Sequence, residues 1–255
     1  MTLQYARLFQ LRAGIQLIAE SGPMSKKELT DALRQRKTIN ADETATEGAD
    51  DIIEQLRDAN LIKNSEEGYR LTAEEEFNDK GVVLTYSGEE VVGAGDQRAQ
   101  ADRILANIMY QHPMLLVLSK FIYRKGPVKD YEVMREFDGE AFIGDKMNQF
   151  TIDMGLDLLE DADVIEPGDN GYIQGRWPVR LFAHVIYEEY SDLIGDGGSI
   201  REPELFERLE TLYGIPRRTF DNYIKRLHTA GIVSEGSYKQ LTLNESVLEG
   251  AKIYE

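Results

Sequence analysis

The sequence predicts an α+β, mostly helical fold made of three tandem domains, each a three-helix core with a small β-hairpin. Three observations predict this fold. One amphipathic helix motif occurs three times, the same hairpin signal follows each copy, and a similar short helix precedes each copy. The chain has 255 residues, of which 42% are hydrophobic, and this is enough for several small packed cores.

The repeated helix motif occupies segments 51–62, 154–165 and 222–233, which align on Leu56, Leu159 and Leu227. Apolar residues stand three and seven positions before each of these leucines, so that they share one helical face. Each copy then has an alanine followed by a turn residue, and we expect the helix to end there. These pairs are Ala59 with Asn60, Ala162 with Asp163, and Ala230 with Gly231.

A β-hairpin signal follows each helix, in segments 61–71, 164–173 and 232–241. Each segment has an apolar pair, a polar turn that contains glycine, and a tyrosine (Tyr69, Tyr172 and Tyr238). Segment 79–87 fits an extra strand, whose partner the sequence does not indicate.

The upstream part of each copy begins with glycine and one apolar residue, which predict a short strand at Met24, Val128 and Ile200. A short amphipathic helix follows the strand, and a longer apolar helix precedes it, over 3–20, 104–123 and 178–194. Segment 88–97 is rich in glycine and predicts a linker. The expected domains are 1–78, 100–176 and 177–255, with 79–99 as a linker that includes the extra strand. Trp177, at the second boundary, predicts packing between domains.

The order of helix, strand, helix, helix and hairpin resembles the winged helix-turn-helix superfamily, in which the hairpin is the wing. The resemblance covers most of the chain, and segment 212–227 of the third copy is its closest match. There, Gly214 stands in the turn, Pro216 opens the second helix, and Phe220 and Ile224 face the core. The first two copies differ from this pattern, with polar insertions at 38–46 and 138–149. The resemblance implies that the second helix of the motif enters the major groove of double-stranded DNA.

The charge pattern indicates which copy could bind DNA. A net charge of −17 argues against broad binding to nucleic acid or to an anionic membrane, but it permits a local basic surface. Residues 214–241 carry five basic and two acidic side chains, whereas the matching windows 44–71 and 147–174 are net acidic. The outward positions are Glu47, Asp50, Asp51 and Glu54 in the first copy, Phe150, Asp153, Met154 and Asp157 in the second, and Arg218, Asp221, Asn222 and Lys225 in the third.

We therefore expect a non-enzymatic DNA-associated protein, either a transcription regulator or a DNA-binding subunit. The predicted DNA-binding residues are Arg217, Arg218, Thr219, Asn222, Lys225, Arg226 and, in the wing, Lys239. The alternative is an acidic scaffold that binds protein partners through the first two copies, in a chromosome- or DNA-processing complex, without touching DNA. In this respect the chain is similar in size and charge to the kleisin-interacting subunits of bacterial condensins. A basic face that is only solvated, or that binds an acidic partner, is the remaining interpretation.

Catalytic and metal chemistry find little support in the sequence. The absence of cysteine excludes a thiol nucleophile and cysteine-ligated metals, and the three histidines fall in different copies. Segment 138–147 has acidic side chains near Lys146, and its pattern is typical of a loop. We expect no cofactor, no metal, no membrane span and a cytoplasmic location. An apolar face on the N-terminal helix suits a homodimer, with Leu3, Leu8, Leu11 and Ile15.

Overall fold

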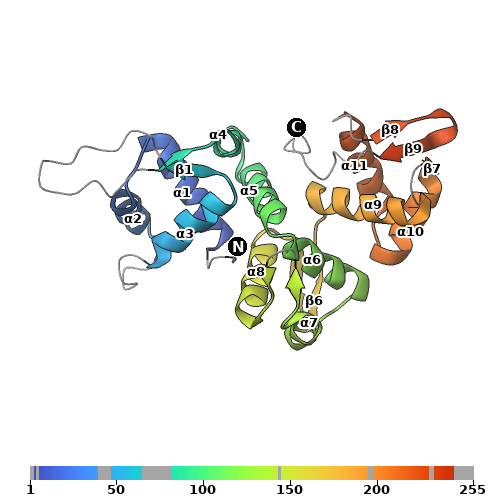
Figure 1. Cartoon of the computed structure of the whole chain (residues 1–255), viewed down its shortest axis with the longest axis horizontal. Helices are drawn as coiled ribbons and strands as arrows, with labels where there is room; N and C mark the ends of the chain where they lie inside the picture. Colours follow the sequence, from blue (N-terminus) through green and yellow to red (C-terminus); the bar gives the residue numbers. More distant parts are fainter. Residues whose placement is uncertain are drawn as a thin grey trace, which may run out of the picture. The chain divides into compact units, whose positions relative to one another are not determined.

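The structure, a computed structural model, describes residue 3 and residues 6–39, 47–64, 82–142, 145–194, 198–229 and 233–243. Within these ranges the chain is mostly helical, with eleven α-helices and four small antiparallel sheets (Figure 1). None of the described helices has both the length and the apolar character needed to cross a membrane.

Contacts in space between Cα atoms group the chain into two compact units. The first unit contains Met1–Met114 and Met134–Ala162, and the second contains Leu115–Val133 and Asp163–Glu255. The second copy of the repeat contributes residues to both units. The division into three domains stays a prediction.

Helix α1 (Leu8–Ser21) is the central helix of the first compact unit. It packs against α2 (Lys26–Gln35), α3 (Glu47–Asp58), α4 (Tyr86–Val92), α5 (Gln97–Gln111) and α8 (Gln149–Asp161). A Cβ atom at Gly14 would lie 3.2 Å from side-chain atoms of both Ile52 and Leu56 of α3. Glycine at this position therefore allows α1 and α3 to approach closely.

The extra strand expected in segment 79–87 is present as β2 (Val82–Leu84), and its partner is β1 (Ile62–Asn64). The two strands are antiparallel, with Ile62 opposite Leu84. The segment predicted as a linker is different from expectation, because it contains most of α4 and the N-cap of α5. Tyr69 and most of the 38–46 insertion lie outside the described residues.

The apolar helix expected over 104–123 is interrupted and forms two helices, α5 and α6 (Met114–Lys125). The interruption falls at His112 and Pro113, because proline lacks an N–H donor and disfavours a helical conformation in the residue before it. His112 is fully buried, and its Nε2 lies 3.4 Å from Nε2 of Gln55 on α3. This histidine is therefore a packing residue of the first compact unit.

The second copy continues with α7 (Asp130–Phe137) and α8. The 138–149 insertion between them was expected to be a loop, but it contains a short hairpin of β3 (Ala141–Phe142) and β4 (Asp145–Lys146). Asn148 then caps α8 by accepting a hydrogen bond from the Thr151 N–H. After α8 the chain forms the hairpin of β5 (Ile165–Gly168) and β6 (Gly171–Gln174).

The third copy lies wholly in the second compact unit. It contains α9 (Val179–Ile194), β7 (Ile200–Arg201), α10 (Glu202–Tyr213), α11 (Arg217–Thr229), β8 (Val233–Glu235) and β9 (Gln240–Leu243), with a short 3₁₀ turn, η1 (Ser237–Lys239), between the last two strands. The three strands form one antiparallel sheet in the order β7–β9–β8.

The copies share local details, of which the sequence predicted the short strand and the turn residue that ends the helix. Met24, Val128 and Ile200 all make β-bridges or strand pairs, and each is followed by a helix whose cap residue stands three positions before a glutamate. These cap and glutamate pairs are Ser25 with Glu28, Lys129 with Glu132, and Arg201 with Glu204. Asn60 and Asp163 end their helices with a φ of 55° each, in the left-handed conformation expected of a turn residue.

The hairpin tyrosines are not equivalent in the structure. Tyr172 lies in β6 and exchanges two backbone hydrogen bonds with Val128, of 2.7 and 2.9 Å. In the third copy, Leu241 rather than Tyr238 stands opposite the upstream strand residue, Ile200. Tyr238 lies instead in η1, at the tip of the β8–β9 hairpin, and the residue is 92% exposed.

The link between the second and third copies is built around Trp177, which lies inside the second compact unit, and its packing between domains stays a prediction. Its buried ring makes edge-to-face contacts with Tyr123 (4.6 Å between centroids) and Tyr213 (6.1 Å). The Tyr123 hydroxyl donates to the carbonyls of Val164 and Arg176, and burial raises the pKa of Tyr123 well above its usual range. Because Trp177 is the only tryptophan of the chain, its fluorescence reports on this junction.

An ion-pair cluster joins α6 to α9 in the second compact unit. Glu188 on α9 accepts a hydrogen bond from Lys120 of α6 and lies 3.3 Å from Nε2 of His184. Burial alone would raise the pKa of Glu188, but the hydrogen bonds and positive charges of His184 and Lys120 outweigh it and lower the pKa to about 2.

We expect this cluster to make the stability of the second compact unit depend on pH in the acid range. A carboxyl group whose pKa is lowered by folding stabilises the folded state at pH values above its unfolded pKa, which is near 4.5. This contribution is lost as the pH falls toward the folded pKa of about 2. Glu188→Gln should cost about 1 kcal/mol at pH 7, a modest figure because water screens this partly exposed group. Urea unfolding followed by Trp177 fluorescence from pH 2 to 7 should show that the difference from wild type vanishes near pH 2. A constant difference across this range would contradict the expectation, and Glu207→Gln on α10 is the control.

Candidate nucleic-acid interface

Helices α10 and α11 are joined by a short turn of three residues, Gly214, Ile215 and Pro216. Gly214 closes α10 in the left-handed conformation, with φ 60° and ψ 26°, and its N–H donates to the Glu210 carbonyl. Ile215 is buried, and the Pro216 carbonyl accepts from the N–H groups of Thr219 and Phe220 at the start of α11. The two helices and the short turn predicted for segment 212–227 are therefore present.

The outward face of α11 carries Arg218, Asn222 and Lys225, which are all exposed. Spacings of four and three residues place them on one side of the helix, whereas Phe220 and Leu227 are buried on the other. Arg218 and Lys225 form no ion pair within the described part of the chain. Arg226 is also exposed, with its guanidinium 5.7 Å from the centre of the Tyr223 ring, and Thr219 is half-buried.

Arg217 differs from the other predicted DNA-binding residues because its guanidinium forms ion pairs within the same copy of the repeat. It pairs with Glu202 on α10 and, at 2.8 Å, with Asp221 on α11. It also lies over the rings of Phe206 (4.8 Å) and Phe220 (5.4 Å). Arg217 therefore attaches the start of α11 to α10, and the cations left for a ligand are Arg218, Lys225 and Arg226.

The first turn of α11 has an unusual charge pattern. It carries two arginines, Arg217 and Arg218, and no acidic residue. The N-terminus of a helix bears a partial positive charge, so that cations there are disfavoured and a bound anion is favoured. Glu202 compensates Arg217, whereas the charge of Arg218 is available to an external phosphate.

The equivalent face of α3 in the first copy is acidic. Asp50 pairs with Lys26 of α2, Asp51 is half-buried, and Glu54 is exposed. The Glu47 side chain lies outside the described residues. Because these carboxylates would repel phosphates, α3 is unsuited to the major groove.

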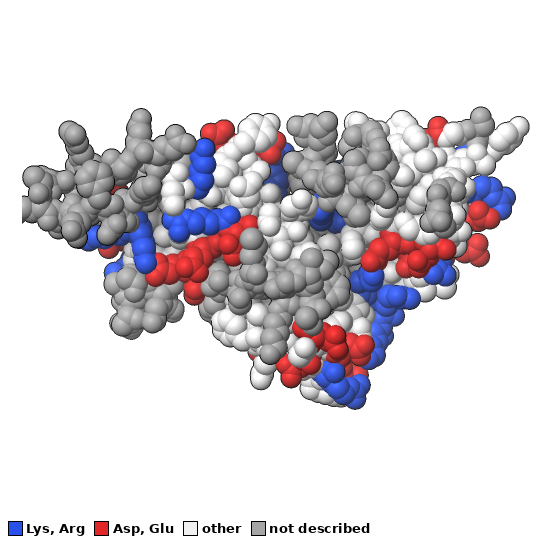
Figure 2. Space-filling model, viewed as in Figure 1, with Lys and Arg blue, Asp and Glu red and all other residues white. Residues whose placement is uncertain are grey.

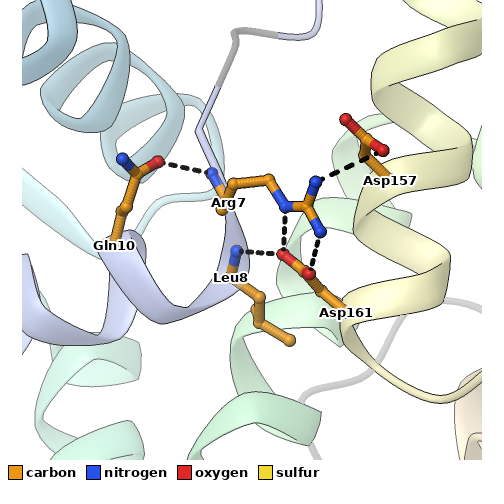
Figure 3. Close-up of polar contacts among 5 residues, drawn as sticks. All are labelled: Arg7, Leu8, Gln10, Asp157 and Asp161. Atoms are coloured by element: carbon orange, nitrogen blue, oxygen red, sulfur yellow. Dashed lines mark hydrogen bonds and ion pairs between the residues drawn. The ribbon is translucent and has the colours of Figure 1, made fainter. Parts of the chain in front are cut away.

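The start of α1 contacts the C-terminal half of the equivalent face of α8 in the second copy (Figure 3). The Arg7 guanidinium lies between Asp157 and Asp161, with Nε 2.8 Å from Asp161 Oδ2 and Nη1 3.3 Å from Asp157 Oδ1. Asp161 also accepts a hydrogen bond of 3.0 Å from the Leu8 N–H. Met154, predicted to face outward, is buried. Of the outward positions predicted for α8, only Phe150 and Asp153 are exposed.

Figure 2 shows basic and acidic side chains next to each other over the face that it presents, with no broad basic area among the described residues drawn there. This distribution agrees with the net charge of −17. A DNA contact would therefore have to be local, as the short row of cations on α11 is.

Features expected of an enzyme are sparse in the second compact unit. A hollow of about 520 Å³ lies between the end of α9 and α10. Its hydroxyl groups, Ser199 and Thr211, form no hydrogen bond to an acid or base within the described residues. Arg208 at the same hollow is bound to the buried carboxylate of Glu189, which also accepts from the Tyr213 hydroxyl. Across the described ranges, no three His, Asp or Glu side chains are grouped as a metal ion would require.

No protein-family model matches the sequence, and no curated protein shows significant similarity to it. The functional assignment therefore depends on the geometry and charge of α11 and of the β8–β9 hairpin.

Proposed function

We propose that the chain is a non-enzymatic DNA-associated protein of three tandem winged-helix domains, which contacts double-stranded DNA through α11 and the β8–β9 wing. It would act as a transcription regulator or as the DNA-binding subunit of a larger assembly. The observation that carries the proposal is the exposed row of Arg218, Asn222 and Lys225 on α11, whose two cations have no ion-pair partner among the described residues.

The side chains of this row suit the chemistry of a major groove. The groove is about 12 Å wide and admits an α-helix. Arginine can donate two hydrogen bonds to guanine or pair with a phosphate, asparagine can bond the edge of adenine, and lysine pairs with phosphate. Lys239, exposed at the hairpin tip, would add a contact to the DNA backbone.

The first two copies have a different role in this proposal. The outward face of α3 is acidic, and that of α8 holds Arg7 of the same chain. Both helices would position the third copy or bind other proteins.

The second candidate function is a scaffold subunit that binds protein partners in a chromosome- or DNA-processing complex without touching DNA. The observation in its favour is that the acidic face of α8 already binds a protein segment, the start of α1, through two carboxylates and one arginine. In that case the cations of α11 would bind an acidic protein.

Fluorescence anisotropy with a labelled random-sequence duplex tests the proposal. We expect the double variant Arg218→Ala/Lys225→Ala to bind about 10-fold or more weakly than wild type at about 100 mM salt. The slope of log affinity against log salt should also fall by about 1.8, because each lost phosphate contact removes about 0.9. Thermal unfolding should be nearly unchanged, since both side chains are exposed.

The matched control is Lys129→Ala/Arg135→Ala, which removes the same charge from exposed positions around α7. It should bind DNA like wild type. Equal losses in both double variants would mean that net charge rather than α11 governs binding, and the proposal would be wrong. Absence of duplex binding at about 25 mM salt would favour the scaffold.

A further inference from the structure

The tip of the β8–β9 hairpin places an aromatic ring and a cation next to each other in solvent. Tyr238 is 92% exposed, and the adjacent Lys239 is exposed too. In Figure 1 the hairpin extends outward from the helices of its own unit. The Tyr238 ring contacts no other aromatic ring or cation within the described residues, so that both of its faces are open.

The backbone at this tip adopts a conformation that its residues disfavour. Tyr238 has φ 62° and Lys239 has φ 58°, so that two successive residues with bulky side chains are in the left-handed region. Glycine and asparagine are the usual residues at such positions, and other residues cost about 1–2 kcal/mol each.

The β5–β6 hairpin of the same chain avoids this conformation in its turn. Asp169 and Asn170, which form the turn, do not have positive φ, and the residue that does, with φ 114°, is a glycine, Gly171, at the start of β6. The third hairpin therefore differs from the second by two bulky residues in an unfavourable conformation, and strained residues of this kind are concentrated at functional sites.

The hairpin holds this tip in a defined position. Glu235 stands opposite Leu241 in the last strand pair, and the Gly236 N–H donates to the Gln240 carbonyl at 2.7 Å. The loop between Gly236 and Gln240 is only three residues long, which keeps the Tyr238 backbone close to the end of the sheet. Because the backbone is already ordered, binding of a flat partner to the ring adds no cost for ordering the loop.

A tyrosine ring beside a lysine suits a ligand that has both a flat surface and a phosphate. A nucleotide whose base is not stacked on a neighbouring base has both. Bases inside a continuous duplex are stacked on both sides, whereas the last base at a junction with single-stranded DNA has an open face. Stacking on an aromatic side chain tolerates any base.

We propose that Tyr238 stacks on the exposed base at a junction between duplex and single-stranded DNA, while Lys239 pairs with the adjacent phosphate. The wing would thereby direct the protein to forks, overhangs or opened duplexes. This inference rests on the proposed DNA-binding function, and it adds the class of DNA that the third copy would select.

The test compares the affinity of the intact protein for a duplex with that for the same duplex carrying an unpaired oligothymidine extension. Wild type should bind the extended duplex about 10-fold more tightly. Tyr238→Ala should bind both at the level of the plain duplex, and Tyr238→Phe should keep the preference. Tyr131→Ala, which removes another exposed tyrosine, should also keep it.

A further variant separates binding from folding. Tyr238→Asn suits the left-handed conformation, so that it should raise the melting temperature while it removes the junction preference. Equal affinity of wild type for the two DNAs, or a preference that survives in Tyr238→Ala, would overturn the stacking role. If duplex binding remained sensitive to Arg218→Ala/Lys225→Ala, the proposed function would stand. Absence of binding to either DNA would overturn both.

Discussion

Gly171→Ala should destabilise the second compact unit by about 3 kcal/mol or more, which is the largest loss that we expect from a single substitution. Gly171 begins β6 with a φ of 114°, a conformation that is essentially closed to residues with a Cβ atom. A Cβ atom here would also overlap the Val128 carbonyl and lie 2.7 Å from the Lys129 nitrogen. The substitution would therefore break the pairing of Val128 with Tyr172. Urea unfolding followed by Trp177 fluorescence measures this loss.

Gly126→Ala separates the two causes of this loss, which are the positive φ and the overlap of a Cβ atom with Val128. Gly126 also has a positive φ, of 80°, but a Cβ atom there would have no neighbour within 4 Å. We expect this control to cost only about 1 kcal/mol, for the backbone conformation alone. Equal losses at the two glycines would mean that the close approach of β6 to Val128 contributes nothing.

The second large effect concerns the contact between Arg7 and α8 (Figure 3). Asp161→Ala should destabilise the first compact unit by about 2 kcal/mol, because it removes the acceptor for both the Arg7 guanidinium and the Leu8 N–H. The Asp161 side chain is only 16% exposed, so that water replaces these bonds poorly. Urea unfolding followed by far-ultraviolet circular dichroism measures the change.

A double-mutant cycle with Arg7→Ala isolates the pair itself, since the two substitutions should be strongly non-additive. Glu160→Gln on the same helix is the control, because this glutamate has no ion pair within the described ranges. Full additivity of Arg7→Ala and Asp161→Ala would show that the pair does not hold α1 to α8.

Local sequence patterns predicted the helices and turns whose formation depends on residues close together in the sequence. The apolar spacing that identified α9 and α11 is set by the helical period, and the turn residues Asn60 and Asp163 have the left-handed backbone that ends a helix. The partner of β1 could not be predicted in this way, because β2 lies about 20 residues further along the chain. The α5–α6 interruption was missed although Pro113 marks it.

Some features of the candidate site also follow from local sequence, whereas others depend on residues far away in the chain. Exposure of Arg218, Asn222 and Lys225 follows from their spacing relative to Phe220, and the sequence was sufficient to predict it. The role of Arg217 depends on Glu202 from another helix, and the contact at the C-terminal half of α8 depends on Arg7, which is 154 residues from Asp161. The position of Tyr238 at the hairpin tip could not be predicted, because the pattern of hairpin tyrosines does not reveal the register with Ile200.

The location of the DNA contact is the central claim, and site-specific photo-crosslinking tests it most directly. One variant would carry p-benzoylphenylalanine in place of Asn222 on α11, and the other in place of Asp153 on α8, both at exposed outward positions. Each would be irradiated with the same duplex at low salt. We predict crosslinks to DNA from position 222 and none above background from position 153. Crosslinks of equal yield from both positions, or none from position 222, would contradict DNA contact through α11.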